Sequence, residues 1–483
     1  MSASDAGPAD ANVPPGRWIV RGVLLAILSF ANLNVIWSPD VIPNALFAWT
    51  LVRSGNVDYD EFTYPSPQQE RPDRIDREAY FFRACGGSTA TEPPRAVRSL
   101  GGPPAPGPND HVCSVFPPGI ALLALPVLVP AVLAGVEPGD ATALLLLGHL
   151  VAAIVETIAT LVLWTTLRRF VSPGWSLGLV LLYTLGTSVR TVASQALWQH
   201  AGVHLFVALA LFLVLVERPV APLRELVAGV LLGFGAVVRQ TTALVALGIG
   251  RRRWLWAVAG FGVGVIPLLV YDAVAFGDPF EQGYGTKPFD APIVTGVAGL
   301  LVSPSRGLLV YEPYIAFAIV ALVLAWRRPG AIAARLRGLG IVALATLLLY
   351  ATYAEWWGGR VFGPRFLDDL APIMFVALGW AIGRGLLASR GVRVAFWATA
   401  GWSLALFNAA ALVYQQGWDN AREVNFHPER LFDWSDPQWL AVLRSLPSGG
   451  ARAAVAALLS IAVLALLLRL ERVRPFARLS STA

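Results

Sequence analysis

The chain has 483 residues, of which 56% are hydrophobic and only 14% are charged. Soluble domains carry about a quarter charged residues, so this deficit excludes a soluble protein and requires repeated apolar segments of about twenty residues. The formal net charge is +6, but the arginines lie beside apolar segments, as membrane topology requires, and do not indicate binding to nucleic acid. The sequence predicts an all-α polytopic membrane protein.

Twelve apolar segments recur along the chain, at 18–38, 119–136, 142–167, 174–190, 201–217, 225–250, 254–272, 307–326, 338–355, 366–384, 394–415 and 451–470. Basic residues cluster beside them, at Arg17 and Arg21, Arg168-Arg169, Arg218 and Arg224, Arg251-Arg252-Arg253, Arg327-Arg328, Arg335 and Arg337, Arg384, Arg390 and Arg393, and from Arg469 onward. The positive-inside rule places these clusters and both termini in the cytoplasm. We therefore expect a multi-pass protein of the cell membrane, with disordered cytoplasmic residues 1–16, one transmembrane domain over 17–472 and a cytoplasmic tail at 473–483.

Two of the twelve segments do not fit a simple crossing. Segment 119–136 has no basic residue at either end, and a full crossing would place Arg168-Arg169 outside, so we expect it to be re-entrant or to lie along the outer interface. Segment 225–250 has basic residues at both ends, which predicts two short helices broken at Arg239-Gln240-Thr241-Thr242. A charged residue at that depth needs protein or water around it, so the break indicates a cavity.

This topology gives the extracytoplasmic face residues 39–118, 191–200, 273–306, 356–365 and 416–450, together with the break at Arg239. Unusual polar and aromatic residues concentrate on that face. Guanidinium groups suit bidentate phosphate binding, and arginine on this face runs against the positive-inside rule. The candidate site residues there are Asp40, Asp58, Trp198, Gln199, His200, Arg306, Glu355, Trp356, Trp357 and Arg365.

Structural explanations of these residues stay open at the level of the sequence. Tryptophans at helix ends commonly anchor a protein at the membrane interface. Arg306 and Arg365 also fit solvated loop charges, and His200 fits a buried, hydrogen-bonded histidine at a helix start. Asp40 precedes an expected helix that starts near Pro43, where it would serve as an N-cap.

Further ionisable side chains lie inside apolar segments. His149 and Glu156 are seven residues apart on one helical face, which predicts a polar pair within the bundle and leaves a proton relay as the alternative. His204 follows His200 by one turn and would share its face. The two histidines could bind a metal, but no carboxylate near them in the sequence completes a ligand set.

Both cysteines, Cys85 and Cys113, lie in the polar loop after the first apolar segment. A disulfide between them would close this loop if it faces an oxidising compartment. Two free thiols are the alternative that the sequence leaves open.

Four stretches carry a family resemblance: Asp40 after the first apolar segment, residues 44–56, Phe116-Pro117-Pro118-Gly119, and the glycine-rich residues 229–235 that lead to Arg239. Over residues 17–385 the chain resembles the GT-C superfamily of integral-membrane glycosyltransferases, in particular the protein O-mannosyltransferases and the aminoarabinose transferases that act on lipid A. Those families usually have an Asp-Glu pair where this chain has Asp40-Val41. The resemblance implies a GT-C-type bundle of about 12 membrane helices, with juxtamembrane helices in a large first extracytoplasmic loop.

The function implied by this resemblance is transfer of a sugar from a polyprenyl-phosphate carrier to a glycan, lipid or protein acceptor, with inversion at the anomeric carbon. Such a reaction needs a base for the acceptor hydroxyl and positive charge for the leaving phosphate. Asp40 is the expected base, and Arg306, Arg365 and Arg239 are expected to bind the lipid phosphate. The residues expected to shape the sugar and acceptor site are Asp58, Trp198, Gln199, His200, Glu355, Trp356 and Trp357. The superfamily includes members that use a divalent metal, but we find no ligand set for one in this sequence.

Two other classes of function also fit a membrane protein of this kind. A transporter or flippase for lipid-linked saccharides would suit the broken helix, although its polar residues should occur on both faces. A non-catalytic partner in an envelope-assembly complex would not need Asp40.

Overall fold

The structure is a computed structural model, and it describes residues 14–64, 71–86, 106–217, 219–250, 254–281, 283–284, 288–414 and 416–471. The predicted tails fall outside these ranges except for residues 14–16, as does the Arg251-Arg252-Arg253 cluster. The described chain is mostly helical, with only four short strands. Five helical runs are long and apolar enough to cross a membrane: 141–167, 254–276, 331–352, 390–413 and 438–471. These features confirm the prediction of an all-α membrane protein, while the count of twelve membrane helices stays a prediction.

The first half of the chain contains α1 (Pro15–Phe30), α2 (Ile42–Trp49), α3 (Gly119–Leu133), α4 (Ala141–Leu167), α5 (Pro173–Leu185), α6 (His200–Val214), α7 (Pro222–Val238) and α8 (Ala243–Ile249). The second half contains α9 (Trp254–Gly264), α10 (Ile266–Phe276), α11 (Ile293–Val302), α12 (Leu308–Tyr311), α13 (Ile315–Trp326), α14 (Ala331–Thr352), α15 (Arg365–Asp368), α16 (Ala371–Ile382), α17 (Arg390–Val413), α18 (Gly417–Ala421), α19 (Gln438–Ser445) and α20 (Gly450–Glu471). The strands are β1 (Thr63–Tyr64), paired in parallel with β2 (Ile75–Asp76), and β3 (Phe82–Ala84), antiparallel to β4 (Val112–Ser114).

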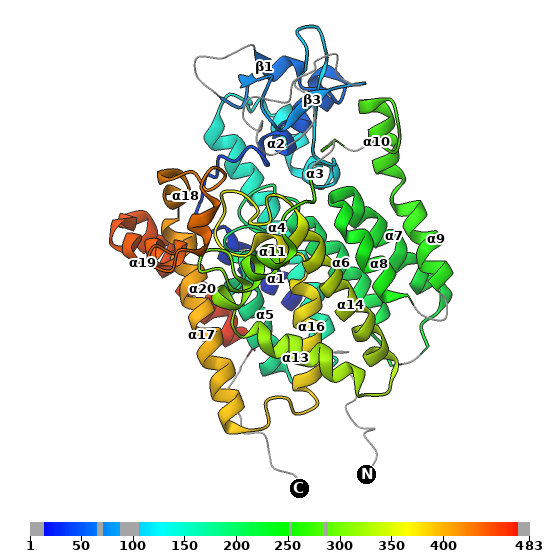
Figure 1. The fold of residues 1–483 in the computed structure, drawn as a ribbon, viewed down its shortest axis with the longest axis vertical. Coiled ribbons are helices and arrows are strands. Elements are labelled where there is room, and N and C mark those ends of the chain that lie inside the picture. The colour runs from blue at the N-terminus through cyan, green and yellow to red at the C-terminus, as the bar shows by residue number, and fades with distance from the viewer. Residues whose placement is uncertain are drawn as a thin grey trace.

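The strands and α2 gather at one end of the molecule, the top of Figure 1, above the helical bundle. The turns between α13 and α14 and between α16 and α17 lie at the opposite end. Arg21 of α1 and Glu471 of α20 form an ion pair at 2.7 Å, so the first and last described helices lie side by side. The bundle therefore separates an end rich in loops and strands, which we call the loop end, from an end made of short turns.

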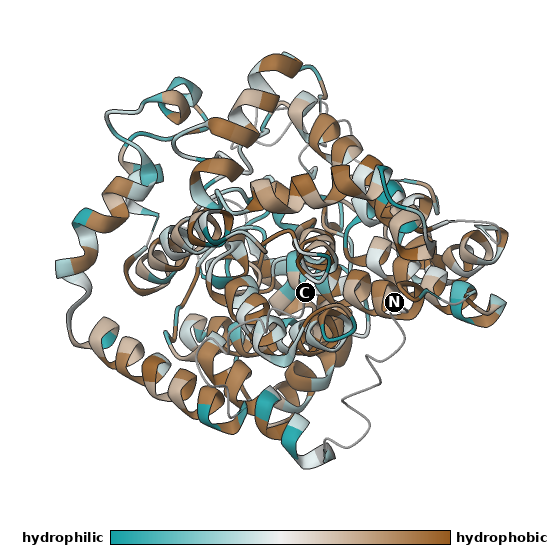
Figure 2. Cartoon of the chain, turned by 90° about the horizontal axis from the view of Figure 1, so that it is seen from below, coloured by the Kyte–Doolittle hydropathy of each residue, from teal (hydrophilic) through white to brown (hydrophobic). Residues whose placement is uncertain are grey.

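Apolar residues run along most of the helices when the molecule is viewed from below (Figure 2). Several of the large apolar side chains are exposed, among them Leu255 at 63%, Val274 at 67% and Leu458 at 68%. Monomeric soluble proteins rarely expose apolar surface on this scale, whereas lipid contact makes it favourable. The outer faces of α9, α10 and α20 are those of a membrane protein.

The first apolar segment is helical over a different stretch from the one predicted. α1 begins at Pro15, inside the predicted tail, and ends at Phe30 instead of near residue 38. The chain then leaves the helix, because Leu33 has a φ of 48° and the Asn32 side chain donates to Gln195 at 2.6 Å instead of extending the helix. Asparagine side chains that bond elsewhere compete with helix formation. Asp40 thus stands well beyond the end of α1.

The break predicted at Arg239 is confirmed. α7 ends at Val238, Arg239 is extended with φ −155° and ψ 118°, and a short 3₁₀ turn over Gln240–Thr242 leads into α8. The segment 119–136 forms a helix of 15 residues with two internal prolines, and it is not among the five long runs. The loop predicted over 273–306 contains a helix, α11, that the prediction did not include.

Glycines allow α7 and α9 to pack backbone against backbone. A Cβ atom built on Gly260 would lie 2.0 Å from the Leu226 carbonyl oxygen, and one built on Gly264 would lie 2.1 Å from that of Val230. Small residues at such crossings let membrane helices approach closely. Gly262, also in α9, has nothing within 4 Å of its built Cβ.

Alanine substitutions at two α9 glycines test this packing. Gly260→Ala should lower the free energy of unfolding by roughly 1–3 kcal/mol, because the methyl group forces two backbones apart. Gly262→Ala is the matched control and should be neutral or stabilising by up to about 1 kcal/mol, since alanine favours the helix. Thermal unfolding in detergent measures both variants, and equal transition temperatures would contradict the close approach.

Candidate functional site

Asp40 precedes α2 at the loop end, and its side chain forms an ion pair. One carboxylate oxygen accepts from Arg365 Nη2 at 2.5 Å, and the other accepts from the Tyr80 hydroxyl at 3.1 Å. Burial and the neighbouring carboxylate raise the pKa of Tyr80 well above its ordinary value, so this phenol stays protonated and donates. The N-cap position of α2 is Val41, without a side-chain cap. The capping explanation of Asp40 is therefore wrong.

Arg365 begins α15 and connects Asp40 to His200, the first residue of α6. Its Nε donates to His200 Nε2 at 3.1 Å, and the other ring nitrogen, Nδ1, lies 2.7 Å from Asp369 Oδ1. Asp369 follows Arg365 by four residues, which places both on one side of the turn. This pattern fits a neutral imidazole that accepts from Arg365 and donates to Asp369.

Arg239 reaches the same place from the break between α7 and α8. Its Nη1 lies 3.2 Å from His200 Nε2, and its Nε lies 3.3 Å from Asp369 Oδ2. The same Nε donates to the Tyr350 hydroxyl at 3.1 Å. We call Asp40, His200, Arg239, Arg365 and Asp369 the Asp40 cluster: two guanidinium groups and two carboxylates joined by one imidazole.

Trp198 and Gln199 lie immediately before His200 and border the Asp40 cluster. The Arg365 guanidinium lies 5.6 Å from the centroid of the Trp198 ring. The indole Nε1 of Trp198 is buried and has no hydrogen-bond partner in the described part of the chain. Gln199 bonds to the Tyr284 hydroxyl at 3.3 Å. The Trp198 N–H is thus a buried donor without a partner among the described residues, and the face of its ring lies against Arg365.

Arg306 does not join the Asp40 cluster, contrary to the prediction that both arginines bind the lipid phosphate beside Asp40. All five of its N–H donors are taken by protein acceptors: Trp357 O, Ser305 O, Gln438 Oε1, Gly359 O and Asp419 Oδ1. Its side chain is 1% exposed, against 13% for Arg365 and 12% for Arg239. Arg306 therefore has no donor left for a phosphate, and its role is structural.

Trp356 and Trp357 are buried beside each other, and the backbone of Trp357 contacts Arg306. The Trp356 ring packs on Phe432, with ring centroids 5.6 Å apart, and Trp357 Nε1 donates to Asn425 at 3.0 Å. Glu355 accepts from the Tyr353 hydroxyl at 3.3 Å. The two tryptophan rings thus hold the loop over 416–450, and the structure gives them no exposed face on which a sugar could stack.

Asp58 belongs to a separate, more exposed group in the first loop. Asp58, Asp60 and His111 could together hold a metal ion, because their ligand atoms lie within 4.8 Å of one another. His111 Nδ1 lies 2.5 Å from Asp60 Oδ2, while Asp60 Oδ1 accepts from the Val112 backbone at 2.8 Å. Asp60 therefore ties β4 to the loop without any metal. Asp58 was a candidate from the sequence, but its grouping with His111 was not, because about fifty residues separate the two.

The His111–Asp60 contact makes a prediction about pH. The hydrogen bond that His111 donates to Asp60, followed by the charges of Asp60 and Asp58, raises the pKa of His111. The pair should therefore be fully formed below the ordinary histidine pKa of about 6.5 and be lost as pH rises through the higher folded value. Asp60→Asn should bring the His111 titration, followed by NMR, back toward the ordinary value.

Asp58→Asn is the matched control for this titration. It removes a charge that acts on His111 only through space, so it should lower the pKa less than Asp60→Asn does. An equal effect of the two substitutions would contradict the Asp60 hydrogen bond.

The buried histidines do not pair as predicted. His149 bonds to backbone oxygens of Asn34 at 3.1 Å and Ser29 at 3.3 Å, and Glu156 instead accepts from His204 at 2.9 Å. His200 and His204 each meet a carboxylate that is remote in sequence, so the two do not form one metal site. Glu156 and Asp369 thus each have a histidine partner, which lowers the cost of burying a carboxylate.

Cys85 and Cys113 form a disulfide, with 5.2 Å between their Cα atoms. Cys113 lies in β4 opposite Arg83 of β3, and Cys85 follows β3 directly. The bridge thus closes the β3–β4 hairpin close to Tyr80, which donates to Asp40.

Three residues of the site region did not emerge as candidates from the sequence: Tyr80, Tyr350 and Asp369. Asp369 had a usable signal, because it lies four residues from Arg365 in a turn already rich in charge. Tyr80 and Tyr350 had no such signal in the sequence, since each reaches the site from a distant part of the chain.

The chain was also compared with known proteins. No protein-family model, curated protein or solved structure matches it. Inference about function therefore rests on the geometry of the site itself.

Proposed function

We propose that this protein is an inverting glycosyltransferase of the GT-C type, which moves a sugar from a polyprenyl phosphate to an acceptor at the loop end. The observation that carries the proposal is the ion pair between Asp40 and Arg365, 2.5 Å apart and 20% and 13% exposed. A carboxylate and an arginine that ligands can reach are the two groups that this transfer needs.

The lipid phosphate competes with Asp40 for the guanidinium group of Arg365. A phosphate oxygen pair can take the guanidinium N–H groups in a bidentate contact that is at least as favourable as the one with Asp40. Arg239, 3.2 Å from His200 through its Nη1, supplies a second positive charge on the same side. Donor binding then releases the Asp40 carboxylate to accept a proton.

The chemical step balances with the groups of this site. The acceptor hydroxyl oxygen forms a bond to the anomeric carbon from the face opposite the phosphate, and its proton passes to Asp40. The bond between the anomeric carbon and the phosphate oxygen breaks, and its electron pair stays on that oxygen. Arg365 and Arg239 stabilise the charge that develops there.

Asp40→Asn tests the proposed base. Transfer from a lipid-linked sugar in detergent should fall by about a hundredfold or more, because the amide cannot take the proton. Asp73→Asn is the matched control: Asp73 forms an ion pair with Arg71 at 2.9 Å in the same loop and should leave transfer unchanged. Activity of Asp40→Asn within twofold of the wild type would remove Asp40 from the mechanism. A flippase would release no polyprenyl phosphate in detergent at all.

Arg365→Ala tests the phosphate contact. The apparent affinity for polyprenyl phosphate should fall by about tenfold or more, since a charged hydrogen bond to phosphate is lost. Arg365→Lys should recover only part of it, because lysine lacks the planar fork. Arg53→Ala removes an exposed arginine that pairs with Glu137 at 3.0 Å and should not change donor affinity. Unchanged affinity in Arg365→Ala would mean that Arg365 serves only to neutralise Asp40.

A further inference from the structure

The segment that carries Arg365 into the site has little regular structure of its own. Between the end of α14 and the start of α15, Gly358, Gly359 and Gly363 have φ of 74°, 77° and 83°. Glycine reaches these angles readily, but it also loses the most conformational freedom on folding. Something outside this segment must therefore select one conformation.

Hydrogen bonds from side chains select this backbone conformation. Five consecutive carbonyl groups, those of residues 357 to 361, each accept a hydrogen bond from a side chain. Arg306 binds the first and third, Arg365 the second, Gln416 the fourth and Gln438 the fifth. We call residues 357–363 the clamped turn. Its backbone conformation is held mainly by groups remote in sequence.

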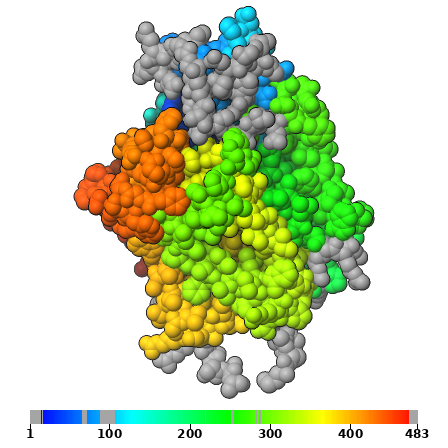
Figure 3. Space-filling view, viewed as in Figure 1, coloured from blue at the N-terminus to red at the C-terminus, as the bar shows by residue number. Residues whose placement is uncertain are grey.

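Two of these groups come from the loop between α17 and α20. α18 and α19 form a knob on one flank of the molecule, orange in Figure 3. Gln438 is the first residue of α19 and is fully buried. Its amide nitrogen donates to Val361 O at 2.8 Å, and its amide oxygen accepts from Gly363 N at 3.2 Å. Gln438 of the knob thus forms two hydrogen bonds with the backbone of the clamped turn.

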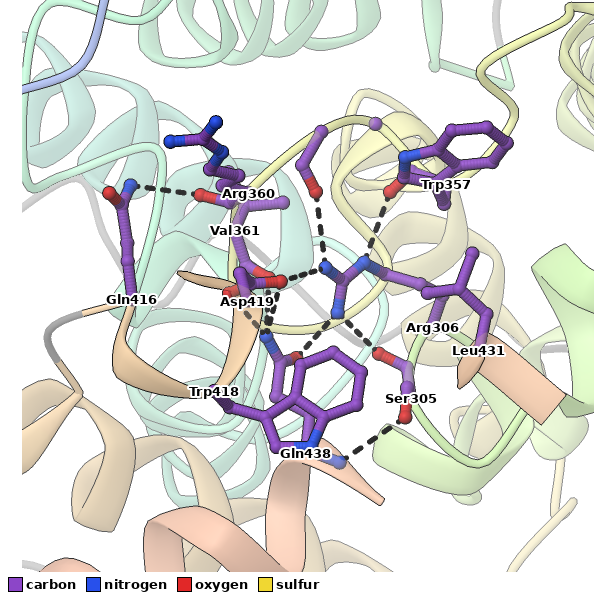
Figure 4. Close-up of polar contacts among 12 residues, drawn as sticks. Ser305, Arg306, Trp357, Arg360, Val361, Gln416, Trp418, Asp419, Leu431 and Gln438 are labelled. Carbon is purple, nitrogen blue, oxygen red and sulfur yellow. Dashed lines mark hydrogen bonds and ion pairs between the residues drawn. The ribbon is translucent and has the colours of Figure 1, made fainter. Parts of the chain in front are cut away.

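Arg306, in the turn before α12, donates further hydrogen bonds to the backbone of the clamped turn. Figure 4 shows its guanidinium between the knob and the clamped turn, directed at the carboxylate of Asp419 and the carbonyl of Trp357. The distances are 2.7 Å to Asp419 and 3.2 Å to Trp357 O. Asp419 also accepts from Tyr414 and from Gln438. Arg306, Asp419 and Gln438 form one buried network, which we call the Arg306 network.

The two charges of this network, those of Arg306 and Asp419, neutralise each other. Burial raises the pKa of Asp419 to about 6, with Arg306 opposing that rise. The carboxylate is therefore mostly ionised at neutral pH and neutralises Arg306. Removing one partner of a buried pair leaves the other charge uncompensated, so this contact resists opening.

We propose that the Arg306 network is a positioning device for the site: it fixes the clamped turn so that Arg365 reaches Asp40 and the donor phosphate. Arg306, Asp419 and Gln438 act through the backbone of residues 357–363 and do not touch the reacting groups. Figure 4 shows the side chains through which the knob holds this backbone. The part of the proposal that concerns the phosphate rests on the proposed function, whereas the part that concerns the Arg365–Asp40 contact does not.

The test uses the full-length protein with Gln438→Ala. This substitution removes the hydrogen bonds from the Gln438 side chain to the clamped turn and leaves the buried Arg306–Asp419 pair in place. Hydrogen exchange at the amides of residues 358–362 should become about tenfold faster, as expected for loss of roughly one net hydrogen bond. Arg365 should also react faster with phenylglyoxal, read by peptide mass spectrometry, because its ion pair with Asp40 loosens. Exchange in α4 should not change, which shows that the variant is folded.

Asp419→Asn is a second variant that weakens the same network from the other side, and it should give the same two changes. Glu429→Gln is the matched control. Glu429 lies in the same loop, is 59% exposed and pairs with Arg422 at 2.6 Å, so its loss should change neither measurement. Exchange and Arg365 reactivity within twofold of the wild type in both network variants would overturn the proposal.

Binding of polyprenyl phosphate separates this proposal from the proposed function. If the wild-type chain binds the lipid, Gln438→Ala should weaken binding by about tenfold while the melting temperature stays nearly constant. Unchanged binding together with faster exchange would overturn the positioning role. If the wild-type chain binds no polyprenyl phosphate, the proposed function fails, and exchange and Arg365 reactivity still decide whether the network positions Arg365.

Discussion

Ion pairs between buried and half-buried side chains are the constraint on which the loop end of this protein depends, because an uncompensated charge away from water is strongly unfavourable. Asp40 meets Arg365, Asp369 meets His200 and Arg239, and Arg306 meets Asp419. These contacts join parts of the chain that are far apart in sequence. They bring α6, the break after α7, α15 and the loop before α20 to one end of the molecule.

Two of these ion pairs differ in a way that separates their roles. The Arg306–Asp419 pair is almost fully buried, with every arginine donor occupied, so it can only hold structure. The Arg365–Asp40 pair is partly exposed, so a ligand can compete for either member. The clamped turn runs between these two ion pairs. Because the Arg306–Asp419 pair holds its backbone in place, it also fixes the position of Arg365 relative to Asp40. A site whose charged groups must change partners during a reaction needs such a fixed frame around it.

Local patterns predicted some parts of this protein well. The charge deficit and the long apolar segments predicted a helical membrane protein, and basic residues at both ends of 225–250 predicted the break at Arg239. Asp40, Arg239, His200, Trp198 and Arg365 were all candidates, since charged and aromatic residues stand out in an apolar chain. Arg306 stood out in the same way, and its predicted phosphate role was wrong because sequence does not show which donors are already occupied.

The sequence by itself determined the class of the protein and the identity of its unusual residues, because hydropathy and charge placement are local properties that the bilayer acts on directly. Only the tertiary structure decided which of these residues meet. Pairing Asp40 with Arg365 spans more than three hundred residues, and the partners of Asp58, Glu156 and Arg306 are equally non-local. Such contacts follow from how helices pack and how an irregular turn is held, and neither is encoded in the spacing of residues along the chain.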